Sequence, residues 1–502
     1  MATRSPITLF IAALACAAWL GLPGAAGASA GQESIFQDDN LLLSSGDATR
    51  ERTLDELQGL GVDTIRAFVT WSALAPAARA TRRPVFAAAS PAGYAPGDWD
   101  RYDELVRSTT RRGLGLILVP TSPIPAWASQ CPGSISIRLT CNPNPADFAP
   151  FVTALGTRYS GGYGDENGGV LPRVFRWAVF NEANVGQWLT PQFVVRRGRV
   201  VPNSPQRYRL LVNAATAGLR TSGHGGDQVM IGETGPIGKT GGPLRTRPVA
   251  TAEFFRSLFC IDTAGRSLTG RAAVDQGCTR PRRLAATAIS HHPYVQGGSR
   301  APTSAPRPDE ITIANAGRLK GLMAQAARRG RIAANLPIYY TEFGFQTRPP
   351  DRALGVSLAQ QATYLNQSDS LAFRDSRIRG VAQYLLVDDT RLGGFQTGLR
   401  FADGRAKPGL EAYRFPVHVV RDGIFVRVFG QVRQAANGAR EVVRVQVLLP
   451  GKPWQTYKQL TTNSKGFVST RLRSRRGRWR LEWAPADGSS SRFSRVTQEA
   501  TR

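Results

Sequence analysis

Two glutamates that closely follow apolar runs are the residues of this chain best suited to chemistry. Glu182 follows the run at residues 174–180, and Glu342 follows the run at 337–340. A carboxylate at the end of a buried strand is costly unless it is paired or used, although a lone one is more often a solvated loop residue. Two of them at one edge of a sheet can act together, because one can protonate a leaving oxygen while the other attacks an anomeric carbon.

Other polar residues at predicted strand ends would support such a pair. His292 and Tyr294 follow a third apolar run, and their side chains can donate hydrogen bonds to a carboxylate that must stay charged. Arg66 lies in a fourth run, where its charge would lower the pKa of a neighbouring carboxyl group. Glu233 follows a fifth run, and we interpret it as a structural or ligand-binding carboxylate.

The elements that must position these residues alternate regularly along the chain. Apolar runs are separated by amphipathic stretches whose apolar residues recur at three- and four-residue spacing, which predicts βα units and a parallel sheet. We therefore predict a (β/α)8 TIM barrel over residues 31–415, with a doubly wound open sheet as the competing architecture. The expected strands are residues 34–43, 62–69, 115–119, 175–180, 228–231, 286–290, 337–340 and 380–386.

The helical period is lost after Phe415-Pro416. Short alternating strands between residues 423 and 483 predict a small all-β domain, a β-sandwich of the immunoglobulin or prealbumin type, over residues 416–496, followed by a tail at 497–502. This region is strongly basic, above all at 471–480. Such a segment could bind an anionic polymer or stack on sugar, and the alternative is an edge hairpin kept soluble by outward arginines.

Taken together, the motifs resemble those of the clan A glycoside hydrolases, in particular the cellulase-like family 5 and the xylosidase-like family 39. An Asn-Glu pair alone is a weak motif, but these elements in this strand order are specific. The resemblance covers residues 34–415. The matching elements are Arg66 and Trp71 on the second strand and its loop, Asn181-Glu182 on the fourth, His292-Pro293-Tyr294 on the sixth and Glu342 on the seventh.

The resemblance implies a retaining hydrolase of β-linked oligo- or polysaccharides that needs no metal and no cofactor. Glu182 would be the acid/base and Glu342 the nucleophile. Many relatives carry a tryptophan at the end of the eighth strand, where this chain has Tyr384, so the sugar preference stays open. The competing hypothesis is a catalytically silent carbohydrate- or cell-wall-binding protein on the same scaffold. The expected substrate-binding residues are Asn181, Arg66, His292, Tyr294, Trp71 and Tyr384.

Residues 1–30 have the form of a secretory signal peptide. Arg4 precedes an apolar stretch, and Ala28-Ser29-Ala30 has the small-residue pattern of a cleavage site. We therefore expect a secreted protein without a membrane-spanning segment. In an oxidising compartment, the simplest pairing of the remaining cysteines is between sequence neighbours. A zinc site is the rival, but the cysteines lack its spacing. The expected disulfides are Cys131–Cys141 and Cys260–Cys278.

The chain carries a formal net charge of +28, contributed almost entirely by arginine. A field of this sign favours anionic partners, such as acidic polysaccharides or cell-wall polymers, through the basic C-terminal domain. No sequence motif for nucleic-acid recognition is present, so we expect no specific nucleic-acid partner.

Overall fold

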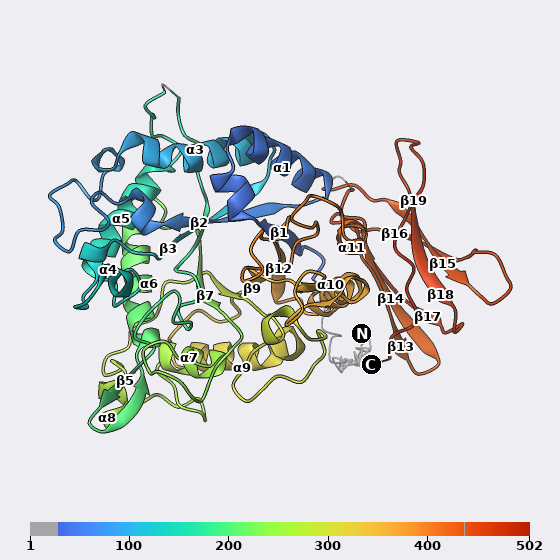
Figure 1. The fold of residues 1–502 in the computed structure, drawn as a ribbon. Coiled ribbons are helices and arrows are strands. Elements are labelled where there is room, and N and C mark those ends of the chain that lie inside the picture. Colours follow the sequence, from blue (N-terminus) through green and yellow to red (C-terminus); the bar gives the residue numbers. More distant parts are fainter. Residues whose placement is uncertain (1–28, 168, 436, 502) are drawn as a thin grey trace, which may run out of the picture.

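The computed structural model describes residues 29–167, 169–435 and 437–501 (Figure 1). Residues 1–28 of the predicted signal peptide lie outside the described residues. Eight parallel strands close a barrel in the order β1-β12-β9-β8-β7-β4-β3-β2, which follows the chain and confirms the predicted TIM barrel. The barrel strands are β1 (Glu33–Gln37), β2 (Thr64–Thr70), β3 (Gly115–Thr121), β4 (Arg176–Ala178), β7 (Gln228–Thr234), β8 (Ala288–His291), β9 (Ile338–Tyr340) and β12 (Ile378–Tyr384).

Helices surround the barrel, and short strand pairs extend its loops. Two of these pairs, β5 (Phe193–Arg196) with β6 (Arg199–Pro202) and β10 (Thr347–Arg348) with β11 (Val356–Ser357), lie outside the barrel sheet. The helices are α1 (Asp47–Gly59), α2 (Trp71–Leu74), α3 (Pro96–Arg111), α4 (Ile135–Arg138), α5 (Pro145–Arg158), α6 (Ser204–Thr221), α7 (Thr251–Leu258), α8 (Gly270–Asp275), α9 (Ala316–Arg328), α10 (Leu358–Phe373) and α11 (Pro408–Arg414).

Two barrel strands are shorter than their apolar runs suggest. The first was expected to reach residue 43, but it ends at Gln37 because the next residues form a helical turn in which Asp38 accepts a hydrogen bond from the Leu41 amide. The fourth ends at Ala178, and Phe180 then adopts a positive φ of 58°. Left-handed backbone does not continue a strand, so the polar residues after β4 turn out of the sheet.

Side chains fill the interior of the barrel, as close packing requires. The interior is therefore a core rather than a channel, and room for a ligand exists only beyond the strand ends. The buried apolar residues of this cluster come from most of the barrel strands: Ile35, Ile117, Val119, Ala178, Met230, Ala288, Tyr339 and Ala382.

The C-terminal region is a sandwich of two antiparallel sheets with strand orders β13-β14-β17 and β16-β15-β18-β19. Valines from both sheets and two tryptophans of β18 are the main residues of its core. The predicted tail is part of this domain, because Thr497 pairs with Trp479 and Ala500 pairs with Val420. The strands are β13 (Val417–Asp422), β14 (Phe425–Gln431), β15 (Val442–Leu448), β16 (Gln455–Thr461), β17 (Phe467–Arg473), β18 (Arg478–Ala484) and β19 (Arg492–Phe493).

The sandwich is docked beside the barrel, near the amino ends of its strands (Figure 1). Lys465 forms an ion pair of 3.0 Å with Asp63, which directly precedes β2. Phe373 at the end of α10 contacts the rings of Phe429 and Phe467 from the sandwich. Sites in a barrel of this kind lie at the carboxyl ends of the strands, so the sandwich does not cover the mouth.

Both predicted disulfides are present. Cys131 is bonded to Cys141 in the loop after β3, and Cys260 is bonded to Cys278 in the segment between α7 and β8. Each bond closes a local loop, as the pairing of sequence neighbours predicts. Among the described helices, none is both long enough and apolar enough to cross a membrane.

Candidate active site

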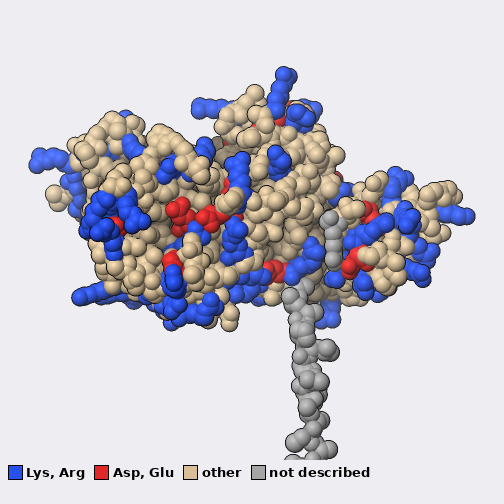
Figure 2. Space-filling model, turned by 90° about the horizontal axis from the view of Figure 1, so that it is seen from below, with Lys and Arg blue, Asp and Glu red and all other residues tan. Residues whose placement is uncertain are grey.

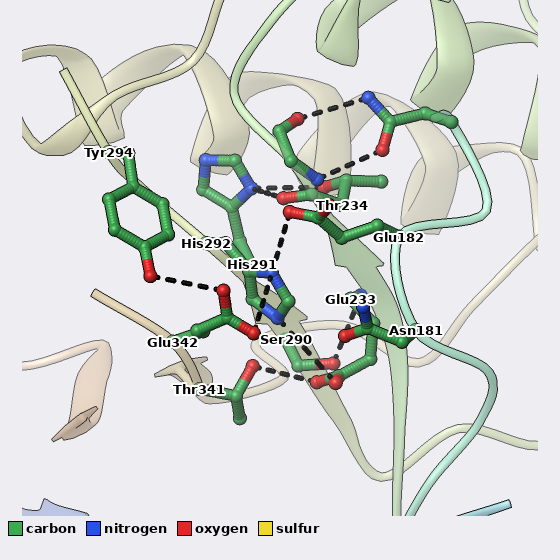
Figure 3. A network of polar contacts seen from close by, with 12 residues as sticks. Asn181, Glu182, Glu233, Thr234, Ser290, His291, His292, Tyr294, Thr341 and Glu342 are labelled. Atoms are coloured by element: carbon green, nitrogen blue, oxygen red, sulfur yellow. Dashed lines mark hydrogen bonds and ion pairs between the residues drawn. The ribbon is translucent and has the colours of Figure 1, made fainter. Parts of the chain in front are cut away.

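Glu182 and Glu342 meet at the carboxyl-end mouth of the barrel, as predicted (Figure 3). Each offers a carboxylate oxygen within 4.8 Å of the other and of a ring nitrogen of His292. Both carboxylates are largely covered, because the side chain of Glu182 is 18% exposed and that of Glu342 is 8% exposed. The two groups therefore face each other across a space that one reacting bond can occupy.

The backbone after β4 is held so that Glu182 points into this space. Glu182 has a positive φ of 36°, an uncommon conformation for a residue other than glycine. Its amide donates to the carbonyl of Glu233 at 2.8 Å. Asn184 completes the clamp, because its side-chain amide donates to the carbonyls of Gly235 and Val249 at 3.0 and 3.1 Å. The loop after β4 is thus tied to the loop after β7.

Glu342 is surrounded by groups that stabilise its charge. The hydroxyl of Tyr294 donates to its Oε1 at 3.0 Å (Figure 3). Nη1 of Arg66 lies 3.4 Å from its Oε2. Burial raises the pKa of the Glu342 carboxyl, and His292, Arg66 and the Tyr294 hydrogen bond oppose this effect. The charge of the Glu182 carboxylate acts in the same direction as burial and also raises the pKa of Glu342.

Arg66 from β2 is completely buried and organises the floor of the site. Its guanidinium donates to Gln37, to Oδ1 of Asn181 at 2.7 Å and, through two nitrogens, to Glu233. Such a planar group holds its several donors in one rigid fork, which fixes the relative positions of the acceptors that it contacts. Asn181 is therefore fixed in orientation directly beside Glu182.

Glu233 lies beneath the pair and is fully buried. Burial alone would raise its pKa, but the charges of Arg66 and His292 and a 2.7 Å hydrogen bond from Thr341 hold that pKa well below its usual range. Glu233 is thus a permanent negative charge. Of the two roles left open by the sequence, these contacts favour the structural one.

His292 connects all three carboxylates. Its Nδ1 lies 3.0 Å from Glu182 and 3.8 Å from Glu342, while its Nε2 lies 3.6 Å from Glu233. Burial lowers its pKa, but the carboxylates outweigh burial and raise the pKa of His292 to about 9. The polar contacts of its neighbour His291 are with the backbone carbonyls of Thr234 and Ile311 and with the hydroxyl of Thr234, and burial lowers the pKa of His291 to about 4.

Five charged side chains form one cluster at the centre of the site. Arg66 and His292 contribute two positive charges, and Glu182, Glu233 and Glu342 contribute three negative charges when all are ionised. A single proton shared by Glu182 and Glu342 therefore makes the cluster neutral. Burial favours that neutral state. The same cations act against a metal here, although Glu182, His292 and Glu342 offer three ligand atoms near one another.

Of the two aromatic residues predicted to contact substrate, Tyr384 is accessible and Trp71 is not. Tyr384 ends β12, is half-buried, and meets the exposed ring of Phe395 edge-on at 5.2 Å. Trp71 is 1% exposed and stacks on Phe151 at 5.4 Å within the hydrophobic core. Because other rings cover it, Trp71 offers no surface to a sugar, and we assign it to packing.

Some residues of the site could not be identified from the sequence. Gln37 contacts Arg66, and Thr341 contacts Glu233. Each is an ordinary polar residue at a strand end. Asn184 fixes the loop after Glu182, yet nothing in the sequence around it indicates that role. Only the position at a carboxyl strand end marked them in advance.

The sequence matches no protein-family model and no curated protein. Solved structures with similar folds include GH5_18 from Streptomyces cattleya in complex with GlcNAc, with 16% identity over 77% of this chain and 80% of that one and a TM-score of 0.46. The endo-beta-1,4-mannanase from Thermotoga petrophila has 12% identity over 94% of this chain and 99% of that one, with a TM-score of 0.41.

A third similar structure is the exo-beta-1,4-mannosidase from an Opitutaceae bacterium, strain TAV5, with 14% identity and a TM-score of 0.42. The match covers 77% of this chain and 61% of that one. At such identities and scores, these similarities carry no argument about activity. The class of the molecule is defined by its own geometry, a TIM barrel with a buried pair of carboxylates at its mouth.

Proposed function

We propose that this protein is a retaining hydrolase of β-linked glycosides. The observation that carries the proposal is the pair Glu182 and Glu342, whose carboxylate oxygens approach within 4.8 Å. Retaining enzymes hold their carboxyl groups about 5–5.5 Å apart, whereas inverting enzymes leave about 6.5–9.5 Å for a water molecule. The neutral cluster with one shared proton supports the same assignment, since one glutamate must be an acid while the other is charged.

The proposed reaction has two displacements. Glu342 attacks the anomeric carbon as Glu182 transfers its proton to the glycosidic oxygen, so the leaving alcohol departs and a glycosyl ester forms on Glu342. A water molecule then attacks the same carbon while Glu182 takes its proton, which releases the sugar and restores both carboxyl groups. Glu182 is suited to the acid role because it lacks the contacts with Tyr294 and Arg66 that stabilise charge on Glu342.

Neighbouring residues would orient the sugar. Arg66 occupies Oδ1 of Asn181, which leaves the amide NH2 group to donate to the sugar 2-hydroxyl. Tyr294 and His292 would hold the charge of Glu342, and Tyr384 lies where a sugar ring can rest at the end of β12. The substrate would be a β-linked oligo- or polysaccharide. Secretion belongs to the proposal, supported by the two disulfides and the predicted signal peptide.

The test uses Glu342→Gln and a panel of aryl β-glycosides. The wild type is expected to hydrolyse at least one member with retention of configuration, and the variant is expected to lose that activity. Glu411→Gln, on α11 and 59% exposed, is the matched control and should behave as the wild type. Glu182→Ala should slow hydrolysis of glycosides with poor leaving groups by about 10²–10⁴-fold and spare activated ones, since only poor leaving groups need the acid.

Two outcomes would refute the assignment. A wild type that binds oligosaccharides but hydrolyses none of the panel would be the carbohydrate-binding protein of the competing hypothesis. An active Glu342→Gln variant, or a first product of inverted configuration, would show that Glu342 is not the nucleophile.

A further inference from the structure

A second concave site lies in the sandwich, outside the active site. It is a pocket of about 590 Å³ lined by the turn between β15 and β16, the turn between β17 and β18, and the last residues of the chain. Four of its five charged lining residues are cationic. The charged residues that line it are Arg421, Lys452, Arg476, Arg478 and Glu499.

The one acidic residue that lines this pocket, Glu499, is paired with groups of the sandwich itself. Oε1 of Glu499 accepts from the Arg476 amide at 2.9 Å and from the Trp479 indole at 3.3 Å, and Ser474 donates to both oxygens. Arg421 forms an ion pair with Oε2 at 2.6 Å, and the Glu499 side chain is only 4% exposed. Its charge is therefore unavailable to the remaining cations.

Three cations of the pocket are free of such contacts. Lys452, Arg476 and Arg478 are exposed, and within the described part of the chain none of their side chains has an ion pair or a ring contact. Other arginines of the sandwich behave differently. Arg475 lies over the ring of Tyr457 at 4.9 Å, and Arg480 lies over Trp454 at 4.2 Å.

The basic character extends over the visible surface of the sandwich. Lysine and arginine side chains outnumber acidic ones on the face of this domain at the right of Figure 2. Outward arginines that only maintain solubility need no common direction. Here three free cations from two different turns border a single pocket, so an anion placed in it would interact with all of them.

We propose that this pocket binds an anionic polysaccharide and that it recognises the carboxylate or sulfate groups of the polymer. Lys452, Arg476 and Arg478 would bind the anions, and the aliphatic side chains of Leu448 and Leu449 would contact the sugar ring. The lining contains no aromatic ring, so it offers no platform on which a nucleic-acid base can stack. That difference favours a glycan over a single-stranded nucleic acid.

The pocket lies at the end of the sandwich that faces away from the barrel. In the register of the first sheet, Asp422 pairs with Phe425 and Phe425 pairs with Arg473, so the turn after Arg473 lies beside the β13–β14 turn. The contacts with the barrel, through residues such as Arg433 and Lys465, lie at the opposite ends of these strands. A polymer held in the pocket therefore leaves the mouth of the barrel free.

Binding of the polysaccharide to this pocket does not depend on the proposed function. The effect of that binding on catalysis rests on the proposed glycosidase activity. An enzyme anchored to a polymer meets that polymer at a raised effective concentration. Anchoring should therefore increase the rate on anionic polymers and leave hydrolysis of small aryl glycosides unchanged.

The test is the full chain with Lys452→Gln, Arg476→Gln and Arg478→Gln combined, measured by calorimetry against polygalacturonate and dextran sulfate. Each exposed charge contributes roughly threefold to affinity, so the triple variant should bind about 30-fold more weakly. Wild-type binding should weaken when NaCl is raised from about 0.05 M to 0.5 M because salt screens exposed charges. The two probes separate carboxylate from sulfate recognition, and neutral dextran should not bind.

The matched control removes three arginines from the barrel surface between α8 and β8: Arg280→Gln, Arg282→Gln and Arg283→Gln. All three are exposed, and the substitution lowers the net charge equally. This variant should bind the anionic glycans as the wild type does. A second variant that exchanges lysine and arginine at the three pocket positions keeps the charge and should retain binding, which separates loss of charge from loss of fold.

Three results would overturn the proposal. They are equal weakening in the barrel control, unchanged binding in the pocket variant, and tighter binding of oligo(dT) than of either glycan through the same residues. Failure of the proposed function would look different, because the wild type would then bind the glycans without hydrolysing any glycoside.

Discussion

The third carboxylate gives the sharpest test of the electrostatics of the site. Glu233→Gln removes one negative charge and preserves shape. Nε2 of His292 lies 3.6 Å from Glu233, and unit charges about 4 Å apart interact by about 4 kcal/mol at an effective dielectric constant of about 20. That energy corresponds to about 3 pKa units. The pKa of His292 is raised to about 9 by its carboxylates, so the variant should bring it toward about 6.

The charge of His292 decides the pH range in which this residue supports Glu342. Below its pKa, His292 is cationic and supports the ionised form of Glu342, and this support is lost as the pH rises through that pKa. The titration of the His292 ring should therefore move from near pH 9 in the wild type to near pH 6 in Glu233→Gln. NMR titration of that ring measures the shift directly and does not depend on activity.

Thr341→Val is the control for this experiment. It removes the 2.7 Å hydrogen bond to Glu233 but keeps the charge, so the pKa of His292 should stay near that of the wild type. Glu233→Gln also leaves the buried Arg66 without its main partner, which costs about 3–5 kcal/mol of stability, so both variants are measured well below their melting temperatures. A His292 titration that does not change in Glu233→Gln would refute the reasoning.

Two further predictions concern other contacts. Tyr294→Phe removes the hydrogen bond that lowers the pKa of Glu342, so the acidic limb of kcat/KM should move up by about one pH unit; an unmoved limb would exclude this role. Arg433→Ala breaks the buried ion pair with Asp369 between sandwich and barrel and should lower the free energy of unfolding by about 3 kcal/mol in chemical denaturation. The exposed Arg427→Ala should cost less than about 1 kcal/mol, and equal losses would contradict the buried interface.

The parts of the fold that repeat were predictable from the sequence. All eight barrel strands were located because each is an apolar run followed by an amphipathic helix, and chain order alone placed Glu182 and Glu342 at the same edge. The pairing of the disulfides followed from sequence proximity. Each of these signals is local or periodic, so no knowledge of distant contacts is needed to detect it.

Other features depend on contacts that no local pattern shows. The first strand of the sandwich, β13, was missed because its run begins directly after the proline that marks the change of texture. Trp71 resembles a substrate contact in sequence, yet rings from α5 cover it. Glu233 is set apart by its pairing with two nitrogens of Arg66 and by its hydrogen bond from Thr341, and both partners are distant from it in sequence.

The docking of the sandwich on the barrel affects how the chain unfolds. Phe373, Phe429 and Phe467 form one small cluster across the junction at residue 415, and all three are buried. Cutting the chain there would expose these rings to water and strand the charge of Asp369. The barrel and the sandwich therefore belong to one cooperative unfolding unit, although the architecture changes at residue 415. The barrel and the sandwich should melt in a single transition, and neither should fold independently when it is transferred to another protein.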